Sequence, residues 1–274
     1  MSETVILGDS GHVDRVIGTR RIVEVMGTVF TIDVRDIDPL APAVRDAVAW
    51  WRWVDQTFST YRSDSEVSRL AAGTLRLDDA AAEVRHVLDL CDQAASASLG
   101  YFTSRPGGTL DPSGMVKGWS VDVASDMLRR AGSEDHCIVA GGDVLCLGAP
   151  SADENWGIGV VDPFDPRRLL AAVSPVSRSR WAIATSGTAE RGDHIVDPIH
   201  GRRPGELASV TVVASTLTVA DWMATAAFAM GHESQSWLEQ HEGVEAYAVT
   251  AEGDYWCTDG FEAMGELIAL PGDA

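Results

Sequence analysis

Hydrophobic and polar positions along the chain follow two periods, and each period predicts one type of secondary structure. Apolar side chains at every third to fourth position predict helices with one buried face. The helical patterns lie at 41–57, at 79–98, from about 116 to 132, at 219–231 and at 233–240. Short runs rich in β-branched residues predict strands. The strand runs are 20–25, 29–35, 137–140, 156–161, 169–173, 181–185, 209–214, 245–250 and 255–258.

The order of these elements indicates the fold class. Helices and strands are mixed, but no strand–helix–strand unit repeats, so we expect an α+β fold with a largely antiparallel sheet and flanking helices. No Pro/Ser-rich linker and no shift in composition divides the chain, which favours a single domain. We place this domain at residues 20–265 and interpret residues 1–19 as an N-terminal extension.

The charge of the chain excludes some partners. Its 274 residues hold 21 Lys and Arg against 41 Asp and Glu, a net charge of −20. Such a surface repels nucleic acids and anionic lipids, so we expect neither as a partner. No apolar run reaches the roughly 18 residues that a membrane helix needs, and the acidic start is unlike a secretory signal. Four cysteines without a CxxC pair agree with the reducing cytoplasm, which is the location we expect.

One helical segment carries a pair of oxygen donors. Asp221 and Thr225 are four residues apart, so on a helix their side chains share one face. A carboxylate beside a hydroxyl suits Mg²⁺, which accepts few protein ligands and completes its shell with water and phosphates. The alternative is structural: Thr218 and Asp221 have the spacing of a capping box, and Thr225 can bond a backbone carbonyl.

A turn rich in Gly and Pro at residues 111–119 opens into another predicted helix. Lys117 lies in its first turn, where free N–H groups and the helix dipole favour an anion. The spacing is not that of a Walker A loop, and a tight turn with a solvated lysine is the alternative. Ser63 and Glu66 have capping-box spacing, and we expect them to have that structural role whatever else the segment does.

His194 is the best candidate for a general base. It lies between Asp193 and Asp197 in a polar segment that follows a buried-looking strand. The alternative is a turn histidine that only bonds a carboxylate. No GxSxG motif is present, which disfavours a serine hydrolase.

Taken in order, these segments resemble the FAD:protein FMN transferase family, also called ApbE. The resemblance covers residues 20 to 258 approximately, and it rests on ordered motifs. The motifs are MGT (26–28), STYRSDSEVS (59–68), DPSGMVKGWSVD (111–122), AGGD (140–143), WGIGVVDP (156–163), ATSG (184–187) with HIVDPIHGRRP (194–204), and VADWMAT (219–225) with AFAMG (227–231).

The resemblance implies a fold related to the T-fold class and a reaction on FAD. In this family Mg²⁺ assists cleavage of the FAD pyrophosphate, FMN passes to a Thr or Ser hydroxyl of a target flavoprotein, and AMP leaves. Hydrolysis of FAD to FMN and AMP would use the same residues, and a flavin-binding protein without turnover is a further alternative. The chain departs from the family pattern at Ala189, where an aromatic residue is common, and at Ala224, where a carboxylate sometimes occurs.

The resemblance also assigns roles to individual residues. Asp221, Thr225 and the backbone carbonyl of Gly114 correspond to metal ligands, and His194 corresponds to the base for the acceptor hydroxyl. The positions that correspond to FAD contacts are Met26, Tyr61, Tyr101, Phe102, Thr103, Asp111, Lys117 and Val196.

Overall fold

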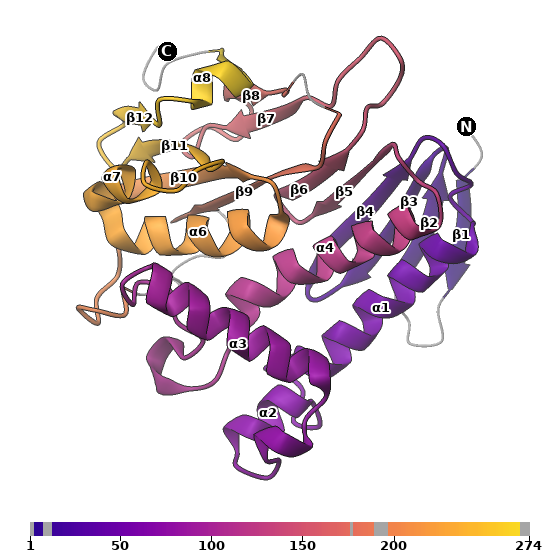
Figure 1. Cartoon of the computed structure of the whole chain (residues 1–274), viewed down its shortest axis with the longest axis horizontal. Helices are drawn as coiled ribbons and strands as arrows, with labels where there is room; N and C mark the ends of the chain where they lie inside the picture. The colour runs from indigo at the N-terminus through magenta and orange to yellow at the C-terminus, as the bar shows by residue number, and fades with distance from the viewer. Residues whose placement is uncertain (1–2, 8–12, 176–177, 189–196, 269–274) are drawn as a thin grey trace.

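The chain folds into three layers, shown in Figure 1. The computed structural model describes residues 3–7, 13–175, 178–188 and 197–268. Long helices cover one face of a large antiparallel sheet, and a small sheet with a short helix lies over part of the other face. The expected α+β class with antiparallel sheet and flanking helices is thereby confirmed, while the relation to the T-fold class stays a prediction.

Within the described residues, ten strands form the large sheet, in the order β1-β2-β3-β4-β5-β6-β9-β10-β11-β12. All neighbours in this sheet pair antiparallel. The strands are β1 (Glu3–Leu7), β2 (Val13–Ile17), β3 (Arg20–Val25), β4 (Thr28–Val34), β5 (His136–Ala140), β6 (Asp143–Leu147), β9 (Trp181–Gly187), β10 (Leu207–Ala214), β11 (Glu245–Thr250) and β12 (Tyr255–Cys257). The small sheet has the order β13-β8-β7, from β7 (Ile158–Val161), β8 (Leu169–Val173) and β13 (Gly265–Leu267).

Two stretches of this sheet differ from the sequence-based expectation. β1 and β2 lie within residues 1–19. β1 pairs with β2, and β2 pairs with β3, so the sheet includes residues before residue 20; the domain boundary there stays a prediction. β6 was not predicted, because four of its five residues are buried and the run lacks the alternation of a half-buried strand.

The helices follow the predicted pattern closely, with differences at their ends. They are α1 (Pro42–Phe58), α2 (Glu66–Ala71), α3 (Ala82–Ala97), α4 (Ser113–Arg130), α6 (Leu217–Met230), α7 (Ser234–Leu238) and α8 (Phe261–Met264), with 3₁₀ turns at Leu77–Asp79, Pro106–Gly108 and Gly231–Glu233. α4 begins three residues before the expected Val116, directly after Pro112.

The short helix α2 was missed, and the Ser63–Glu66 capping box is not what begins it. Ser65 is the N-cap, and its hydroxyl accepts from the Ser68 N–H at 3.0 Å. The Glu66 carboxylate instead accepts from the Ala81 N–H at 2.7 Å, which ties α2 to the residues before α3.

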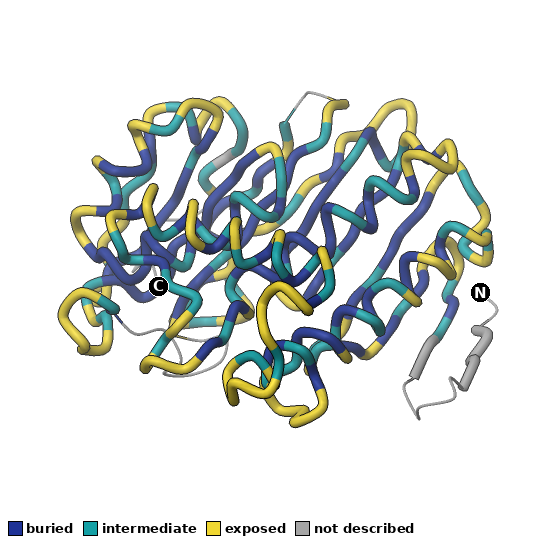
Figure 2. Tube along the Cα trace, turned by 60° about the horizontal axis from the view of Figure 1, so that its bottom comes forward, coloured by how far each residue is buried: buried dark blue, intermediate teal, exposed yellow. Residues whose placement is uncertain are grey.

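Among the residues that the structure describes, two hydrophobic cores hold the layers together. The larger lies between the helices and the large sheet, and Figure 2 shows buried positions along the strands and the inner sides of the helices. The smaller lies between the two sheets and includes Trp181, Tyr247 and Phe261. In the described part of the chain, none of the helices combines the length and apolarity that a bilayer crossing demands.

α4 and α6 pack with their backbones in close contact. A Cβ added at Gly118 would lie 2.5 Å from the carbonyl oxygen of Leu217, so only glycine fits there without a shift of one helix. Asp122, on the next turn of α4, accepts hydrogen bonds from the Leu217 N–H at 3.0 Å and the Thr218 N–H at 2.8 Å. One helix therefore satisfies free N–H groups at the start of the other.

Candidate active site between two helices and the sheet

Asp221 lies in the first turns of α6 and faces α4. Its residue exposure is only 5%, and its Oδ2 accepts from the Gly118 N–H at 3.1 Å. The capping-box interpretation is wrong: the N-cap of α6 is Thr216, whose hydroxyl accepts from the Val219 N–H at 3.2 Å. Asp221 is thus held by the neighbouring helix, with a carboxylate buried beside the start of α4.

Thr225 follows one turn later on the same helix, as its spacing predicts. Its hydroxyl oxygen lies 3.5 Å from the hydroxyl oxygen of Ser186 on β9. A Cβ built on Gly114 would come within 3.9 Å of the Thr225 hydroxyl oxygen. The start of α4, the third turn of α6 and the end of β9 therefore meet at Thr225.

Lys117 joins this group through two ion pairs. Its ammonium contacts Oδ2 of Asp143 and lies 3.6 Å from Oδ1 of Asp221. The side chain of Asp143 has no exposed surface, and its Oδ1 accepts from the Thr185 N–H of β9 at 3.1 Å. One cationic side chain thus lies between two buried carboxylates, and the three formal charges sum to a negative value.

The chemistry of these donors can be compared with what metals require. Among the described residues, no group of three or more His, Cys, Asp or Glu side chains is arranged to hold a metal ion. The site instead offers two oxygen donors, the carboxylate of Asp221 and the hydroxyl of Thr225, with the backbone of Gly114 close to Thr225. A small set of hard oxygen ligands with an excess of negative charge suits Mg²⁺. It does not suit the metals that bind through thiolate or imidazole ligands.

The turn before α4 has a defined geometry. Oδ1 of Asp111 accepts from the Ser113 N–H at 3.0 Å, and the backbone N–H of Asp111 donates to the Ser104 carbonyl at 2.8 Å. This side chain shapes the entry to the helix whose first turns carry Gly114 and Lys117. A direct contact of Asp111 with FAD stays a prediction.

The three residues after Gly100 differ in their surroundings. Phe102 is 2% exposed and packs edge-on against Trp222, with ring centroids 6.2 Å apart. Its ring also lies against Gly114, where a Cβ would meet it at 3.3 Å. The Thr103 hydroxyl accepts from the backbone N–H two residues later, at 3.0 Å. Burial, aided by the nearby Glu233, raises the pKa of Tyr101.

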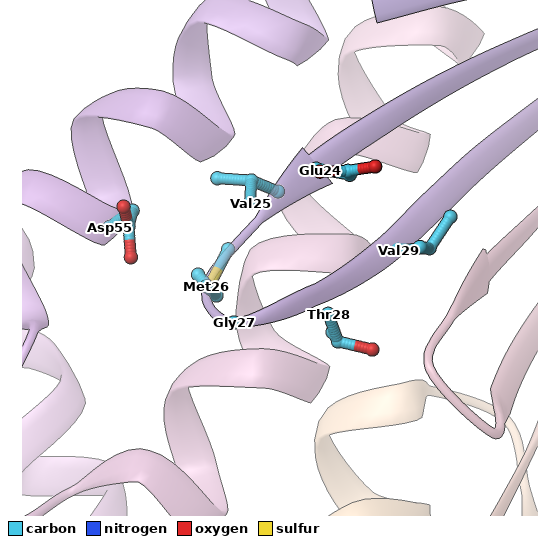
Figure 3. Close-up of a pocket in the computed structure, with 7 residues that line it drawn as sticks. All are labelled: Glu24, Val25, Met26, Gly27, Thr28, Val29 and Asp55. Atoms are coloured by element: carbon cyan, nitrogen blue, oxygen red, sulfur yellow. The ribbon is translucent and has the colours of Figure 1, made fainter. Parts of the chain in front are cut away.

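Met26 lies at the tip of the β3–β4 hairpin, where both turn residues have positive φ, 52° at Met26 and 70° at Gly27. Positive φ at both positions is the backbone conformation of the type I′ turn, which two-residue hairpins favour. A hollow of about 410 Å³ lies around the tip, and Figure 3 shows Asp55 of α1 on its opposite side. Tyr61 is 99% exposed, so its ring contributes no packing that would explain its presence.

His194 and Val196 lie outside the described residues. The chain is described again from Asp197, which is 3% exposed and accepts from the N–H groups of Ile199 at 2.9 Å and His200 at 3.1 Å. Its Oδ2 also lies 2.6 Å from Nδ1 of His200. Burial acts to raise the pKa of Asp197, but the hydrogen bonds from His200 and Ile199 outweigh it and leave the pKa lowered.

The resemblance assigned Asp221, Thr225 and Gly114 to a metal and Lys117 to FAD. The structure places Lys117 3.6 Å from Asp221 and the backbone of Gly114 close to Thr225. The sequence pattern did not indicate Asp143, although the residue lies in the AGGD motif (140–143). It also missed Asp122, whose position inside a helix gives no sign of a cap on another helix. The strand start after Gly141–Gly142 is the local signal that could have drawn notice to Asp143.

Comparison with known sequences gives the family. A sequence model of the ApbE family matches residues 26–105 and 103–248. A protein of Rhodobacter capsulatus named FAD:protein FMN transferase is 30% identical over 237 residues, which cover 83% of this chain and 42% of that protein. A protein of the same name from Vibrio cholerae serotype O1 is 34% identical over 134 residues, covering 45% of this chain and 39% of the relative. The chain thus spans about two fifths of the length of these curated relatives.

Solved structures show the same fold. The ApbE protein of Thermotoga maritima superimposes with a TM-score of 0.79 at 20% identity, covering 89% of this chain and 98% of that one. The flavin transferase ApbE of Vibrio cholerae gives a TM-score of 0.75 at 20% identity, covering 96% and 99%. Since the family model accounts for more than half of the residues, the chain belongs to the ApbE family.

Proposed function

We propose that this protein transfers FMN from FAD to a Thr or Ser hydroxyl of a flavin-accepting protein, with Mg²⁺ bound and AMP released. Membership of the ApbE family and the names of the similar proteins support this activity. The observation that carries it is the convergence of Asp221, Thr225 and Gly114 beside Lys117. Phosphoryl transfer depends mainly on positioning and charge neutralisation, and this group of residues offers both.

Asp221, Thr225 and the Gly114 carbonyl are the residues that we expect to hold the metal. When bound, Mg²⁺ supplies positive charge that stabilises the pyrophosphate oxygens of FAD as the bond between the phosphates breaks. The protein's part is to fix the ligands. The Gly118 N–H orients the Asp221 carboxylate, and the packing of α4 on α6 sets its distance from the backbone of Gly114.

Lys117 and the start of α4 provide the remaining attraction for the phosphates. The net charge of −20 opposes any nucleotide, so binding requires local positive charge. Lys117 is 23% exposed on its side chain, enough to meet a ligand while its ion pairs hold it in place. We therefore expect FAD to bind more weakly in chelator than in millimolar Mg²⁺.

Our proposed base is His194, which would take the proton of the acceptor hydroxyl. Loss of a general base typically costs on the order of 10²–10⁴-fold in rate. His194→Asn should bind FAD nearly as well as the parent, by flavin fluorescence, and transfer FMN far more slowly. His200→Asn is the matched control, since His200 is bonded to Asp197 and should affect transfer little. Transfer at the parent rate by His194→Asn would remove His194 from the mechanism.

One experiment separates transfer from the two alternatives. The protein is incubated with FAD and Mg²⁺, with and without a flavin-accepting protein, and both AMP and protein-bound FMN are measured. Transfer predicts AMP and bound FMN in equal amounts, and only with the acceptor. AMP at the same rate without an acceptor would indicate hydrolysis, and FAD binding without AMP in either case would indicate a flavin-binding protein.

A further inference from the structure

Asp143 is a buried charge that the proposed reaction does not by itself require. It begins β6 directly after the Gly141–Gly142 turn, and its side chain has no exposed surface. A carboxylate taken out of water is costly unless it is paired and hydrogen-bonded. Asp143 has both kinds of partner: Oδ1 accepts from the Thr185 N–H at 3.1 Å, and Oδ2 pairs with the ammonium of Lys117.

The two carboxylates around Lys117 are not equivalent. The ammonium is in contact with Asp143, whereas it lies 3.6 Å from the nearer oxygen of Asp221. Asp143 is tied to the sheet through the Thr185 N–H of the neighbouring strand β9, whereas Asp221 is tied to α4 through the Gly118 N–H. The lysine is therefore held toward the sheet and partly away from α6.

We propose that Asp143 is a positioning residue, which holds Lys117 away from Asp221 so that the Asp221 carboxylate can bind a divalent cation. This inference rests on the proposed metal site. A lysine that paired fully with Asp221 would neutralise that carboxylate and compete with the cation for its oxygens. Held by Asp143, the same lysine leaves Asp221 its charge and stays close enough to meet a phosphate.

The test measures binding of Mn²⁺ alone to the metal-free full chain, without FAD, from the electron paramagnetic resonance signal of the unbound ion. In Asp143→Asn the amide can still accept from the Thr185 N–H but cannot pair with Lys117. We expect Mn²⁺ affinity to fall on the order of tenfold, a size typical of coupling within one ion-pair network. Lys117→Met should bind Mn²⁺ more tightly than the parent, because the competing cation is gone.

The double variant decides the mechanism. If Asp143 acts through Lys117, Asp143→Asn should lose most of its effect on Mn²⁺ affinity in the Lys117→Met background. An equal loss in both backgrounds would overturn the inference, because Asp143 would then be a metal ligand itself or act by its charge alone. Unchanged affinity in Asp143→Asn with Lys117 present would overturn it as well.

Two further variants keep the outcome interpretable. Asp162→Asn removes another buried carboxylate, which is 4% exposed and lies 3.7 Å from Arg168, so it controls for general effects on the fold. We expect it to leave Mn²⁺ affinity at the parent value. Asp221→Ala should lose Mn²⁺ binding. If Asp221→Ala and the parent bind alike, the proposed metal site fails and the role of Asp143 fails with it. If only Asp221→Ala loses binding, the positioning role alone is wrong.

Discussion

The contact between α4 and α6 makes Gly118→Ala a sensitive probe of the site. The added Cβ would meet backbone atoms, at 2.5 Å from the Leu217 carbonyl oxygen, 2.8 Å from its carbon and 3.0 Å from the Thr218 nitrogen. Backbone atoms cannot rotate away as a side chain can. The two helices must therefore separate by about 0.5 Å or more at this point, which is an overpacking change in a tightly packed core.

The expected loss of stability follows from three contributions. Overpacking costs about 1–3 kcal/mol. The hydrogen bond from the Gly118 N–H to Asp221, now 3.1 Å, lengthens, which costs about 1 kcal/mol. Alanine in place of glycine in a helix interior stabilises the helix by about 1 kcal/mol, which offsets part of this loss. The net loss is about 1–3 kcal/mol, or a fall in Tm of about 3 °C or more for a chain of this size.

Thermal unfolding followed by circular dichroism measures this loss, and Mn²⁺ binding measures the effect on Asp221. The matched control for stability is Gly114→Ala on the same helix, where the Cβ would meet two side chains and no backbone, the ring of Phe102 at 3.3 Å and the Thr225 hydroxyl at 3.9 Å. We expect its Tm to stay within about 1 °C of the parent. If Gly118→Ala is as stable as Gly114→Ala, the two helices are not in the close contact on which the geometry of Asp221 depends.

Three other substitutions test separate parts of the structure. Burial lowers the pKa of His136 to about 4 from its ordinary 6.5, so the unfolded chain binds more protons between these values. Stability should therefore fall by up to about 3 kcal/mol as the pH drops from 7 to 4, and His136→Gln should flatten that slope in denaturant titrations. Asp122→Ala removes the acceptor for the Leu217 and Thr218 N–H groups at the start of α6 and should cost at least about 1–2 kcal/mol. Asp126→Ala, which breaks partly exposed ion pairs, should cost under about 1 kcal/mol; equal losses would contradict the stabilising role of Asp122. Tyr61→Ala should leave Tm unchanged but weaken FAD binding, and Phe164→Ala, another exposed aromatic, should change neither; FAD affinity unchanged by Tyr61→Ala would exclude Tyr61 from the flavin site.

The local spacing of hydrophobic residues predicted much of the fold, because it indicates which face of a helix or strand is buried. α1 buries Val44, Val48, Trp51 and Val54, the positions whose spacing predicted it. β6 was missed for the opposite reason, since a strand covered on both faces shows no alternation. The sequence pattern predicted the N-cap of α6 at Thr218, but it lies at Thr216, because both residues suit that position. The Thr218 hydroxyl instead donates to Asp122, a contact between two helices that the sequence does not reveal.

The candidate site was predictable where its residues share one element. Asp221 and Thr225 are on a single helix, so their spacing alone places them on one face. The relation of Asp143 to Lys117 is tertiary: it arises because β6 pairs with β9 and α4 packs on the same side of the sheet as α6. Such a contact between segments 26 residues apart in sequence leaves no periodic signal.

The most direct test compares Asp221→Ala with Thr216→Ala in Mg²⁺-dependent release of AMP from FAD in the presence of a flavin-accepting protein, with Tm measured for both. Thr216 is the N-cap of the helix that carries Asp221, and its loss should cost about 1 kcal/mol of stability while most AMP release remains. Asp221→Ala should stay folded, with a loss of about 1 kcal/mol from the missing Gly118 hydrogen bond, and release no AMP above the rate without enzyme. AMP release at the parent rate by Asp221→Ala would contradict the metal site and, with it, the proposed function.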